Sequence, residues 1–318
     1  MLFERMLSRR NIRVKVMQVL YALSRKATED ATTRASVQYY QKLVDDSFKL
    51  YLFNLLVFVR VAEYARQDKI RREGKLRPTE ADLKFSAKFA DNPLLQSLLK
   101  NYDLTNAHSK YHLGQMLDAD LIRRLYIDFS KEDAYKAYIY EQGDTAEEHI
   151  EIYLELYRFL VSSETFASMA EDHFPLWSDD KSLVVGAMKK TIKALPVEGD
   201  FLDGYRPQDE TIKEFGESLL RKVQDADQDL LNVIEPSLKN WDAERVAVLD
   251  MIILKMAIAE FLYFSSIPTK VTLNEFVEIS KLYSTDKSKD FVNGILDRLL
   301  KKLNEDGLIQ KKGRGLQD

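Results

Sequence analysis

Glycine and proline are scarce in this chain. Its 318 residues include only 11 glycines and 7 prolines, about half of the usual combined share of ~12%. So few turn-forming residues cannot supply the many tight turns of a β-sandwich or barrel, or the glycine loops of a nucleotide-binding α/β sheet. With 45% hydrophobic and 31% charged residues, the chain has the composition of a folded helical protein. The composition therefore predicts an all-α fold.

Apolar residues recur with helical spacing along nearly the whole chain. The first predicted helix, over residues 9–25, carries one apolar stripe, and we expect its basic residues on the other faces. The stripe consists of Ile12, Val16, Val19, Leu20 and Leu23. A long helix is predicted over 37–72. Shorter helices are predicted over 79–90, 93–101, 106–128, 131–141, 145–170, 180–194, 208–224, 228–239, 243–264, 273–283 and 288–304.

The loosest segment lies between Pro196 and Pro207, which also contains Gly199 and Gly204. We place the main domain boundary there, because proline and glycine interrupt regular structure. No fixed-period repeat is present, so a solenoid has little support. Four segments are predicted. Residues 1–74 form N-terminal helices that include a basic helix, and residues 75–195 form a helical insertion of unknown role. Residues 196–306 form a C-terminal helical subdomain, and residues 307–318 form a basic disordered tail.

Two local features stand out in the C-terminal subdomain. Thr272 and Glu275 have the spacing of a capping box, which predicts a helix beginning just after Thr272. Gly294 lies inside the last predicted helix, where glycine costs about 1 kcal/mol relative to alanine. A glycine there suggests close approach by another helix or by a ligand backbone, and of the two we favour close packing by a helix.

The net charge of −4 conceals an uneven distribution. Residues 1–26 contain seven basic residues against the single acid Glu4, a charge of +6, so the rest of the chain carries −10. A charge run is usually a solvated helix face, and charge alone does not decide between that and a nucleic-acid-binding helix.

Several classes of function lack the residues that they need. The chain has no cysteine, which excludes disulfides, thiolate metal sites and cysteine nucleophiles. The apolar run 51–59 is too short to span a membrane, no signal peptide is recognisable, and we expect a cytoplasmic protein. His108 and His112 have zinc-ligand spacing, but Lys110 lies between them and the glutamate of a His-Glu-x-x-His motif is missing. The sequence predicts no catalytic residues, no metal site and no cofactor.

Two segments carry a resemblance to a known family. The first is the basic stretch from Arg9 to Tyr21, which ends in Gln-x-Leu-Tyr. The second contains a Pro-x-Lys-Val-x-x-Asn-Glu block over 268–275 and a Phe-Val-Asn-Gly-x-Leu-Asp block over 291–297. In order and spacing these segments resemble the NusB family of transcription antitermination factors. The resemblance covers the first ~25 residues and about 208–304, and residues 75–195 resemble an insertion.

The resemblance implies two packed helical subdomains without a catalytic site. It implies binding of single-stranded boxA-like leader RNA together with NusE, a ribosomal protein, within the RNA polymerase antitermination complex. The implied RNA-binding residues are Arg9, Arg10, Arg13, Gln18, Tyr21, Lys287, Lys289, Phe291 and Asn293. One position departs from the family pattern, because Asp290 stands where a lysine usually precedes the phenylalanine, and a carboxylate there repels phosphate.

General chemistry supports the same residues, because single-stranded RNA is held by basic side chains along its phosphates and by aromatic platforms for its bases. Taken alone, Phe291 is more often a core residue, Tyr21 is expected to be half-buried, and Glu260 is expected to pair with a buried donor.

Two other functions are weighed. In the first, the chain is an interaction scaffold whose acidic stretches, 141–151 and 198–229, dock basic partners such as NusE and RNA contact is minor. In the second, it is linked to RNA cytosine methylation, which the missing cysteine and glycine loop make unfavourable.

Overall fold

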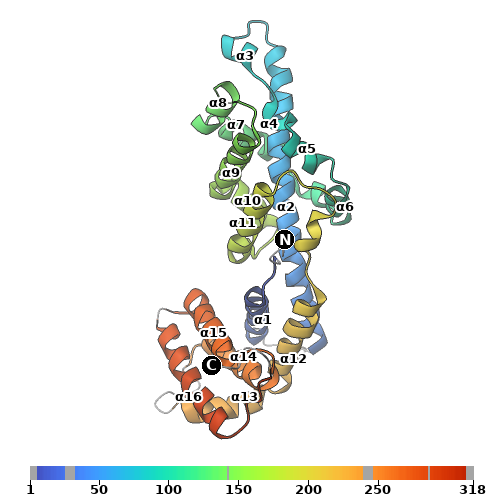
Figure 1. The fold of residues 1–318 in the computed structure, drawn as a ribbon. Helices are drawn as coiled ribbons and strands as arrows, with labels where there is room; N and C mark the ends of the chain where they lie inside the picture. Colours follow the sequence, from blue (N-terminus) through green and yellow to red (C-terminus); the bar gives the residue numbers. More distant parts are fainter. Residues whose placement is uncertain (1–5, 26–32, 142, 239–245, 286, 313–318) are drawn as a thin grey trace. The chain divides into compact units, whose positions relative to one another are not determined.

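The computed structural model describes residues 6–25, 33–141, 143–238, 246–285 and 287–312. Regular structure in these residues is entirely helical (Figure 1), which confirms the predicted all-α fold. The chain forms two compact units. Unit 1 contains Met6 and residues 45–206, and unit 2 contains the described residues of 7–44 and 207–318. The units therefore divide the chain within the long second helix and at 206/207, whereas the predicted segments divide it at 74/75 and 195/196.

Helix α2 (Thr33–Glu73) is the long helix predicted over 37–72, and it contributes to both units. Every residue from 50 to 59 is buried, so this part of the helix is enclosed on all sides by unit 1. The buried Asn54 is hydrogen-bonded on both sides, because its amide donates to the Leu50 carbonyl and its oxygen accepts from the Tyr157 hydroxyl. The apolar run 51–59 is thus the centre of a helical core.

The remaining helices of unit 1 are all shorter than α2 and surround it (Figure 1). They are α3 (Glu80–Lys84), α4 (Lys88–Asp91), α5 (Pro93–Leu99), α6 (Tyr102–Lys110), η1 (Leu113–Met116), α7 (Ala119–Phe129), α8 (Asp133–Tyr140), α9 (Ala146–Ser162), α10 (Glu164–His173), α11 (Trp177–Lys193) and η2 (Phe201–Gly204). Their apolar side chains form one core with α2. Within it Tyr51 stacks on Tyr205 with 4.7 Å between ring centroids, which joins α2 to the end of the unit.

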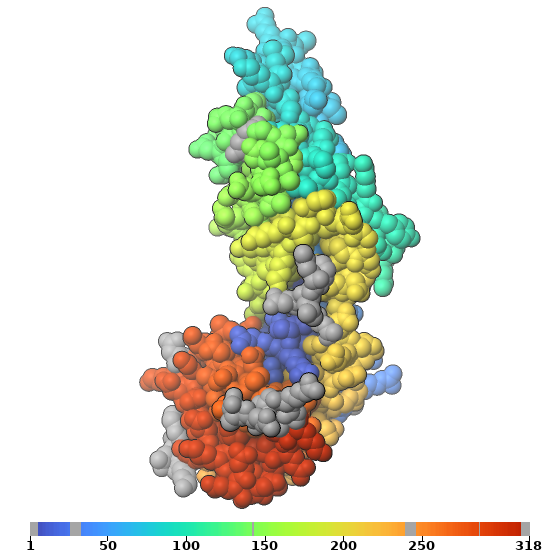
Figure 2. All heavy atoms as spheres, viewed as in Figure 1, coloured from blue at the N-terminus to red at the C-terminus, as the bar shows by residue number. Residues whose placement is uncertain are grey.

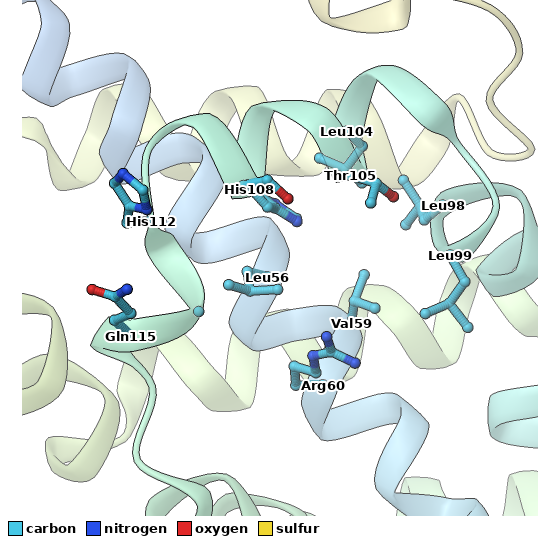
Figure 3. A pocket seen from close by; sticks show the side chains of 12 residues that line it. Leu56, Val59, Arg60, Leu98, Leu99, Leu104, Thr105, His108, His112 and Gln115 are labelled. Atoms are coloured by element: carbon cyan, nitrogen blue, oxygen red, sulfur yellow. The ribbon is translucent and has the colours of Figure 1, made fainter.

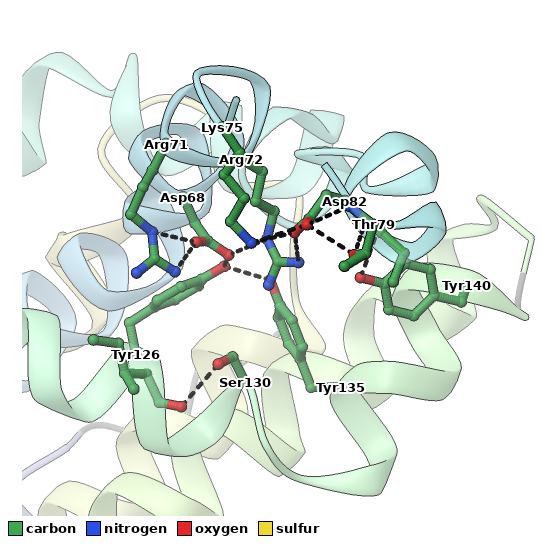
Figure 4. A network of polar contacts seen from close by, with 12 residues as sticks. Asp68, Arg71, Arg72, Lys75, Thr79, Asp82, Tyr126, Ser130, Tyr135 and Tyr140 are labelled. Carbon is green, nitrogen blue, oxygen red and sulfur yellow. Dashed lines mark hydrogen bonds and ion pairs between the residues drawn. The ribbon is translucent and has the colours of Figure 1, made fainter. Parts of the chain in front are cut away.

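A network of charges around two buried carboxylates, Asp68 and Asp82, fixes the end of α2 (Figure 4). Asp68 accepts from Arg71, Arg72 and the Tyr126 hydroxyl, and Arg72 also reaches Asp82 of α3 at 3.1 Å. Burial would raise the pKa of Asp68, but the hydrogen bonds from the two arginines outweigh it and lower that pKa. The network joins α2, α3 and α7.

Unit 2 packs its helices around one central helix. Its elements are α1 (Arg9–Ser24), the first part of α2, the π-helix η3 (Glu210–Glu217), α12 (Ser218–Asp225), α13 (Asp227–Ile234), η4 (Glu235–Ser237), α14 (Val248–Tyr263), α15 (Thr269–Tyr283) and α16 (Ser288–Glu305). Helix α14 contacts α1, α12, α13, α15 and α16. Its buried surface includes two carboxylates, Asp250 and Glu260, one near each end.

These two carboxylates join α14 to α15 as an antiparallel hairpin. Glu260 accepts a hydrogen bond of 2.7 Å from the Thr272 hydroxyl. Asp250 accepts from the hydroxyls of Ser284, at 2.6 Å, and Ser288, at 2.8 Å. The start of α15 therefore lies beside the end of α14, and the start of α16 lies beside the start of α14.

Some predicted helix boundaries are wrong. The helix predicted over 106–128 is interrupted between α6 and α7, where His112 adopts a left-handed backbone with φ of 53°. The helix predicted over 145–170 is divided at Ser163 into α9 and α10. The helix predicted from 243 begins at Val248, and residues 239–245 lie outside the described residues.

Two local predictions in unit 2 are also wrong. Thr272 does not cap α15, which begins at Thr269, because its hydroxyl is directed to Glu260 instead. Gly294 is not closely packed, since no neighbouring atom lies within 4 Å of the position a Cβ would take. By contrast, the helical pattern of α16 is confirmed, with Val292, Leu296 and Leu299 buried.

The described part of the C-terminal tail contacts α14. The Lys311 ammonium donates to the carbonyl oxygens of Glu260, at 3.0 Å, and Phe264, at 2.8 Å, which satisfies carbonyl groups at the helix end. Residues 311 and 312 of the predicted disordered tail are thus held in place, and 313–318 lie outside the described residues. Among the described helices, none is long and apolar enough to cross a membrane.

Candidate RNA-binding surface

Helix α1 begins at Arg9 because Ser8 caps it. The Ser8 hydroxyl accepts from the Asn11 backbone N–H, and the Asn11 side chain accepts from the Ser8 backbone N–H. This start places Arg9 and Arg10 in the first turn, which contains no acidic residue. Cations are unfavourable at a helix N-terminus, and the free N–H groups there attract anions. The first turn of α1 therefore favours binding of an anion such as phosphate.

Arg10 forms a two-point ion pair with Glu275 of α15. Its Nε and Nη2 atoms lie 2.8 Å from Oε2 and Oε1 of Glu275. The hydrogen bond from Arg10 lowers the pKa of Glu275, and the same contact raises the pKa of Arg10. The Arg10 side chain remains 47% exposed, so its guanidinium is held in one orientation at the surface. Figure 2 shows atoms of α1 (dark blue) reaching the surface beside those of α15 (orange).

Arg13 is buried, with 2% of its side chain exposed. It donates to Glu260 from Nε at 2.8 Å and from Nη2 at 2.6 Å, and its guanidinium lies over the rings of Phe215 and Phe276. Lys15 is buried as well. The prediction that the basic residues of α1 occupy its exposed faces is therefore wrong for these two, and Arg13 is not accessible to RNA. Glu260 was predicted to pair with a buried donor, and that donor is Arg13.

Arg9 lies over the ring of Phe215, with 5.5 Å between the guanidinium carbon and the ring centroid. Phe215 belongs to the π-helix η3, a rare conformation that places this ring beneath α1. The next residue, Gly216, must be glycine, because an added Cβ would lie 1.9 Å from the Tyr40 hydroxyl and 2.4 Å from Ile12 Cγ2. The close approach of η3 to α1 supports the orientation of Arg9.

The second half of α1 carries Gln18 and Tyr21, both partly accessible. Tyr21 is 39% exposed, in agreement with the expected half-buried ring. The guanidinium of Arg25 lies 5.8 Å from the centre of that ring. Arg10 and Tyr21 are eleven residues apart, which is close to three helical turns, so they share one side of α1.

The residues predicted in the Phe-Val-Asn-Gly block lie at the start of α16. Lys287 and Lys289 are exposed, and neither forms an ion pair within the described residues, while Phe291 and Asn293 are partly buried. Lys287 and Phe291 line a groove of about 570 Å³ between the starts of α14 and α16. Gly294 widens this groove, and Asp290 and Asp250 add negative charge to it.

The two predicted clusters lie at opposite ends of the α14–α15 hairpin. Arg10 and Arg13 bind at the end that contains Glu260 and Glu275, and the start of α16 binds at the end that contains Asp250. Ten residues separate Asp250 from Glu260, which is about 15 Å along the helix. The two clusters belong to the same unit, but the hydrogen bonds that hold them do not bring them into contact with each other.

The histidine pair considered for zinc lies in unit 1, along a groove of about 560 Å³ (Figure 3). His108 contacts the Leu52 carbonyl oxygen through Nε2 at 3.2 Å, and burial lowers the pKa of His108 to about 4. Among the described residues, no group of three or more histidine, cysteine, aspartate or glutamate side chains is arranged to hold a metal.

A model of the NusB family matches residues 187–301. Three curated relatives carry the name transcription antitermination protein NusB. The chain is 42% identical to the one from Chloroherpeton thalassium over 106 residues, 33% of this chain and 50% of that protein. It is 38% identical to the one from Salinibacter ruber over 109 residues, 34% and 68% of the two chains. This chain belongs to the NusB family. A third NusB protein, from Natranaerobius thermophilus, is 41% identical over 96 residues, 30% and 64% of the two chains.

The match to NusB proteins spans only half to about two thirds of the relatives' length. No solved structure matches this chain. The family match begins at residue 187 and so does not include α1. The structure adds α1 to the matched helices, because Arg13 and Arg10 bind glutamates of α14 and α15.

The sequence did not predict that Phe215 and Glu275 hold the arginines of this surface in place. Phe215 is one of 16 phenylalanines, and nothing in its neighbours indicates a π-helix. Glu275 was assigned to a capping box. Its place in the block 268–275, in a chain that also has an arginine-rich first helix, is the available signal for an ion pair.

Proposed function

We propose that this chain is an RNA-binding transcription antitermination factor. It binds boxA-like single-stranded leader RNA together with the ribosomal protein NusE, and supports processive transcription of ribosomal RNA operons within the RNA polymerase antitermination complex. It acts by binding, without catalysis or a cofactor. One observation carries the proposal: the exposed Arg9 and Arg10 occupy the first turn of a helix that packs in the same unit as residues 207–301 of the NusB-matched segment.

The proposed phosphate contacts come from the first turn of α1. Arg9 and Arg10 are both exposed and both held, Arg9 by the Phe215 ring and Arg10 by Glu275. A guanidinium that is already oriented loses less side-chain entropy when it binds. Arg13 is left out of the contact set because it is buried, and its role in the proposal is to fix α1 on α14.

The proposed base contacts come from Tyr21 on α1 and Phe291 on α16, with Gln18 and Asn293 as hydrogen-bonding neighbours. Stacking of a base on an aromatic ring is worth about 1–3 kcal/mol. Lys287 and Lys289 add phosphate contacts at the start of α16, where the carboxylate of Asp290 opposes them.

The RNA must be long enough to reach both clusters. The ~15 Å between Asp250 and Glu260 along α14 equals about four nucleotides at the stacked spacing of ~3.4 Å per nucleotide. An oligonucleotide shorter than this can reach only one cluster, so affinity should rise steeply with length beyond that point.

The test is a titration of labelled boxA RNA into the full chain, with and without NusE, at several salt concentrations. We compare Arg9→Ala/Arg10→Ala with Lys131→Ala/Lys136→Ala, which removes two exposed cations from unit 1. Each lost phosphate contact should reduce the slope of log K against log salt by about 0.7. The first variant should lower both affinity and slope, and the second should change neither. An unchanged slope for the first variant would contradict the role of α1.

A further inference from the structure

Unit 1 contains a groove that the proposed RNA contacts do not use. One wall is formed by α5 and α6, and the other by residues 197–199, with a volume of about 770 Å³. The second wall is fixed, because the Val197 N–H donates to Ser97 Oγ at 3.0 Å and the Asn101 amide donates to the Gly199 carbonyl at 2.9 Å. Gly199 turns the chain there with a left-handed backbone, φ 55°. The groove is thus held open by specific contacts.

The charge of the groove is negative. Its lining includes the carboxylates of Asp91, Asp103 and Glu198 and a single cation, Lys100. Asp91 is already paired with Arg66 at 2.7 Å. Asp103 and Glu198 form no ion pair within the described part of the chain. The nearby Arg206 feels the charge of Asp103 but is ion-paired with Asp200, so both carboxylates remain able to bind a further cation.

An aromatic ring lies among these carboxylates. Tyr102, the first residue of α6, lines the groove and is 78% exposed. The exposed ring offers a flat apolar face with a polar hydroxyl at its tip. A tyrosine face flanked by carboxylates matches a guanidinium, which stacks on aromatic rings and forms two-point hydrogen bonds with carboxylates.

We propose that this groove binds an arginine-rich segment of a protein partner. A guanidinium stacks on the face of Tyr102 while neighbouring arginines pair with Asp103 and Glu198. The same carboxylates repel phosphates, which excludes RNA as the occupant. The proposal does not depend on RNA binding, because the groove lies in unit 1 and every residue of the RNA surface lies in unit 2.

The probe is a fluorescein-labelled hexa-arginine peptide, titrated into the full chain and followed by fluorescence anisotropy. The variants are Tyr102→Ala and Asp103→Asn/Glu198→Gln. The matched control is Glu147→Gln/Glu151→Gln, which also removes two negative charges, but from the exposed side of α9. Each groove variant should weaken peptide binding by about threefold to tenfold, and the control should leave it within twofold. Hexa-lysine should bind the unchanged chain more weakly than hexa-arginine, because Arg stacks better on Tyr.

Equal weakening by the control would show non-specific attraction to an acidic chain and overturn the proposal. Peptide affinity that is insensitive to Tyr102→Ala would overturn it too. Circular dichroism melting of each variant checks that the fold is retained, and both groove substitutions are at accessible positions. Tyr102→Ala should leave boxA RNA binding unchanged, whereas a loss of RNA binding with retained peptide binding would reverse the assignment of the groove.

Discussion

The guanidinium of Arg13 and the carboxylate of Glu260 form a two-point ion pair in the interior of unit 2. The side chains are 2% and 0% exposed, and the Thr272 hydroxyl donates to the same carboxylate at 2.7 Å. This pair joins α1 to the α14–α15 hairpin. An arginine that sequence resemblance assigns to RNA is therefore part of the framework that positions the exposed Arg9 and Arg10.

Removing one partner of this pair should strongly destabilise unit 2. Glu260→Gln removes the carboxylate that accepts both short hydrogen bonds of the buried Arg13 and leaves it only the longer ion pair with Glu275, at 3.6 Å; breaking a buried pair of this kind costs up to about 3–5 kcal/mol. Urea unfolding measures the change. Glu155→Gln is the control, because it breaks an exposed pair with Arg158 and should cost less than about 1 kcal/mol. Similar costs for the two variants would mean that the buried pair does not anchor α1.

Phe215 should support RNA binding through Arg9. Replacing the ring in Phe215→Leu removes its cation–π contacts with Arg9 and with the buried Arg13. The contact with the exposed Arg9 is worth about 0.5–1 kcal/mol, and its loss should weaken RNA binding a few-fold. The same substitution in an Arg9→Ala background should have little further effect on RNA affinity. This double-mutant cycle, measured by RNA titration, isolates the coupling. Fully additive effects would show that Phe215 acts on RNA binding by another route.

The two glycines of unit 2 helices should respond in opposite directions to alanine. Gly216→Ala forces a methyl group into the Tyr40 hydroxyl and Ile12, and overpacking of this kind costs about 1–3 kcal/mol. Gly294→Ala adds a methyl group in open space within α16 and should stabilise the helix by up to about 1 kcal/mol. Thermal or urea unfolding measures the stability change of each variant. A destabilised Gly294→Ala variant would contradict the observed open environment.

His108 should make the chain less stable in mild acid. Burial lowers its pKa in the folded state from 6.5 to about 4, so the unfolded chain binds more protons between these values and stability falls as the pH decreases through that range. The contribution of the neutral His108 to the free energy of unfolding is fully present above about pH 6.5. His108→Gln should remove about 1–3 kcal/mol of this pH dependence. Urea unfolding at pH 7 and pH 4.5 tests it, and parallel losses in both proteins would rule out His108 as the source.

Helical periodicity predicted most of the elements because each amphipathic helix repeats its own pattern locally. It failed where a tertiary contact overrides that pattern. The helix predicted over 106–128 is interrupted at the left-handed His112. The Thr272 hydroxyl donates a buried hydrogen bond to Glu260 instead of capping α15. Of the predicted site, Lys287 and Lys289 lie exposed at the start of α16, but no local rule distinguishes the exposed Arg10 from the buried Arg13.

The sequence by itself determined the helical class, through its scarce glycine and proline, and the family, through the ordered blocks at 268–275 and 291–297. Both are encoded by residues that are close together in the chain. Only the tertiary structure decided which arginines of α1 reach the surface, since that depends on Glu260, Glu275 and Phe215, more than 200 residues away. Burial of a charge is set by the partner that another helix brings to it, and that partner cannot be read from the charged segment alone.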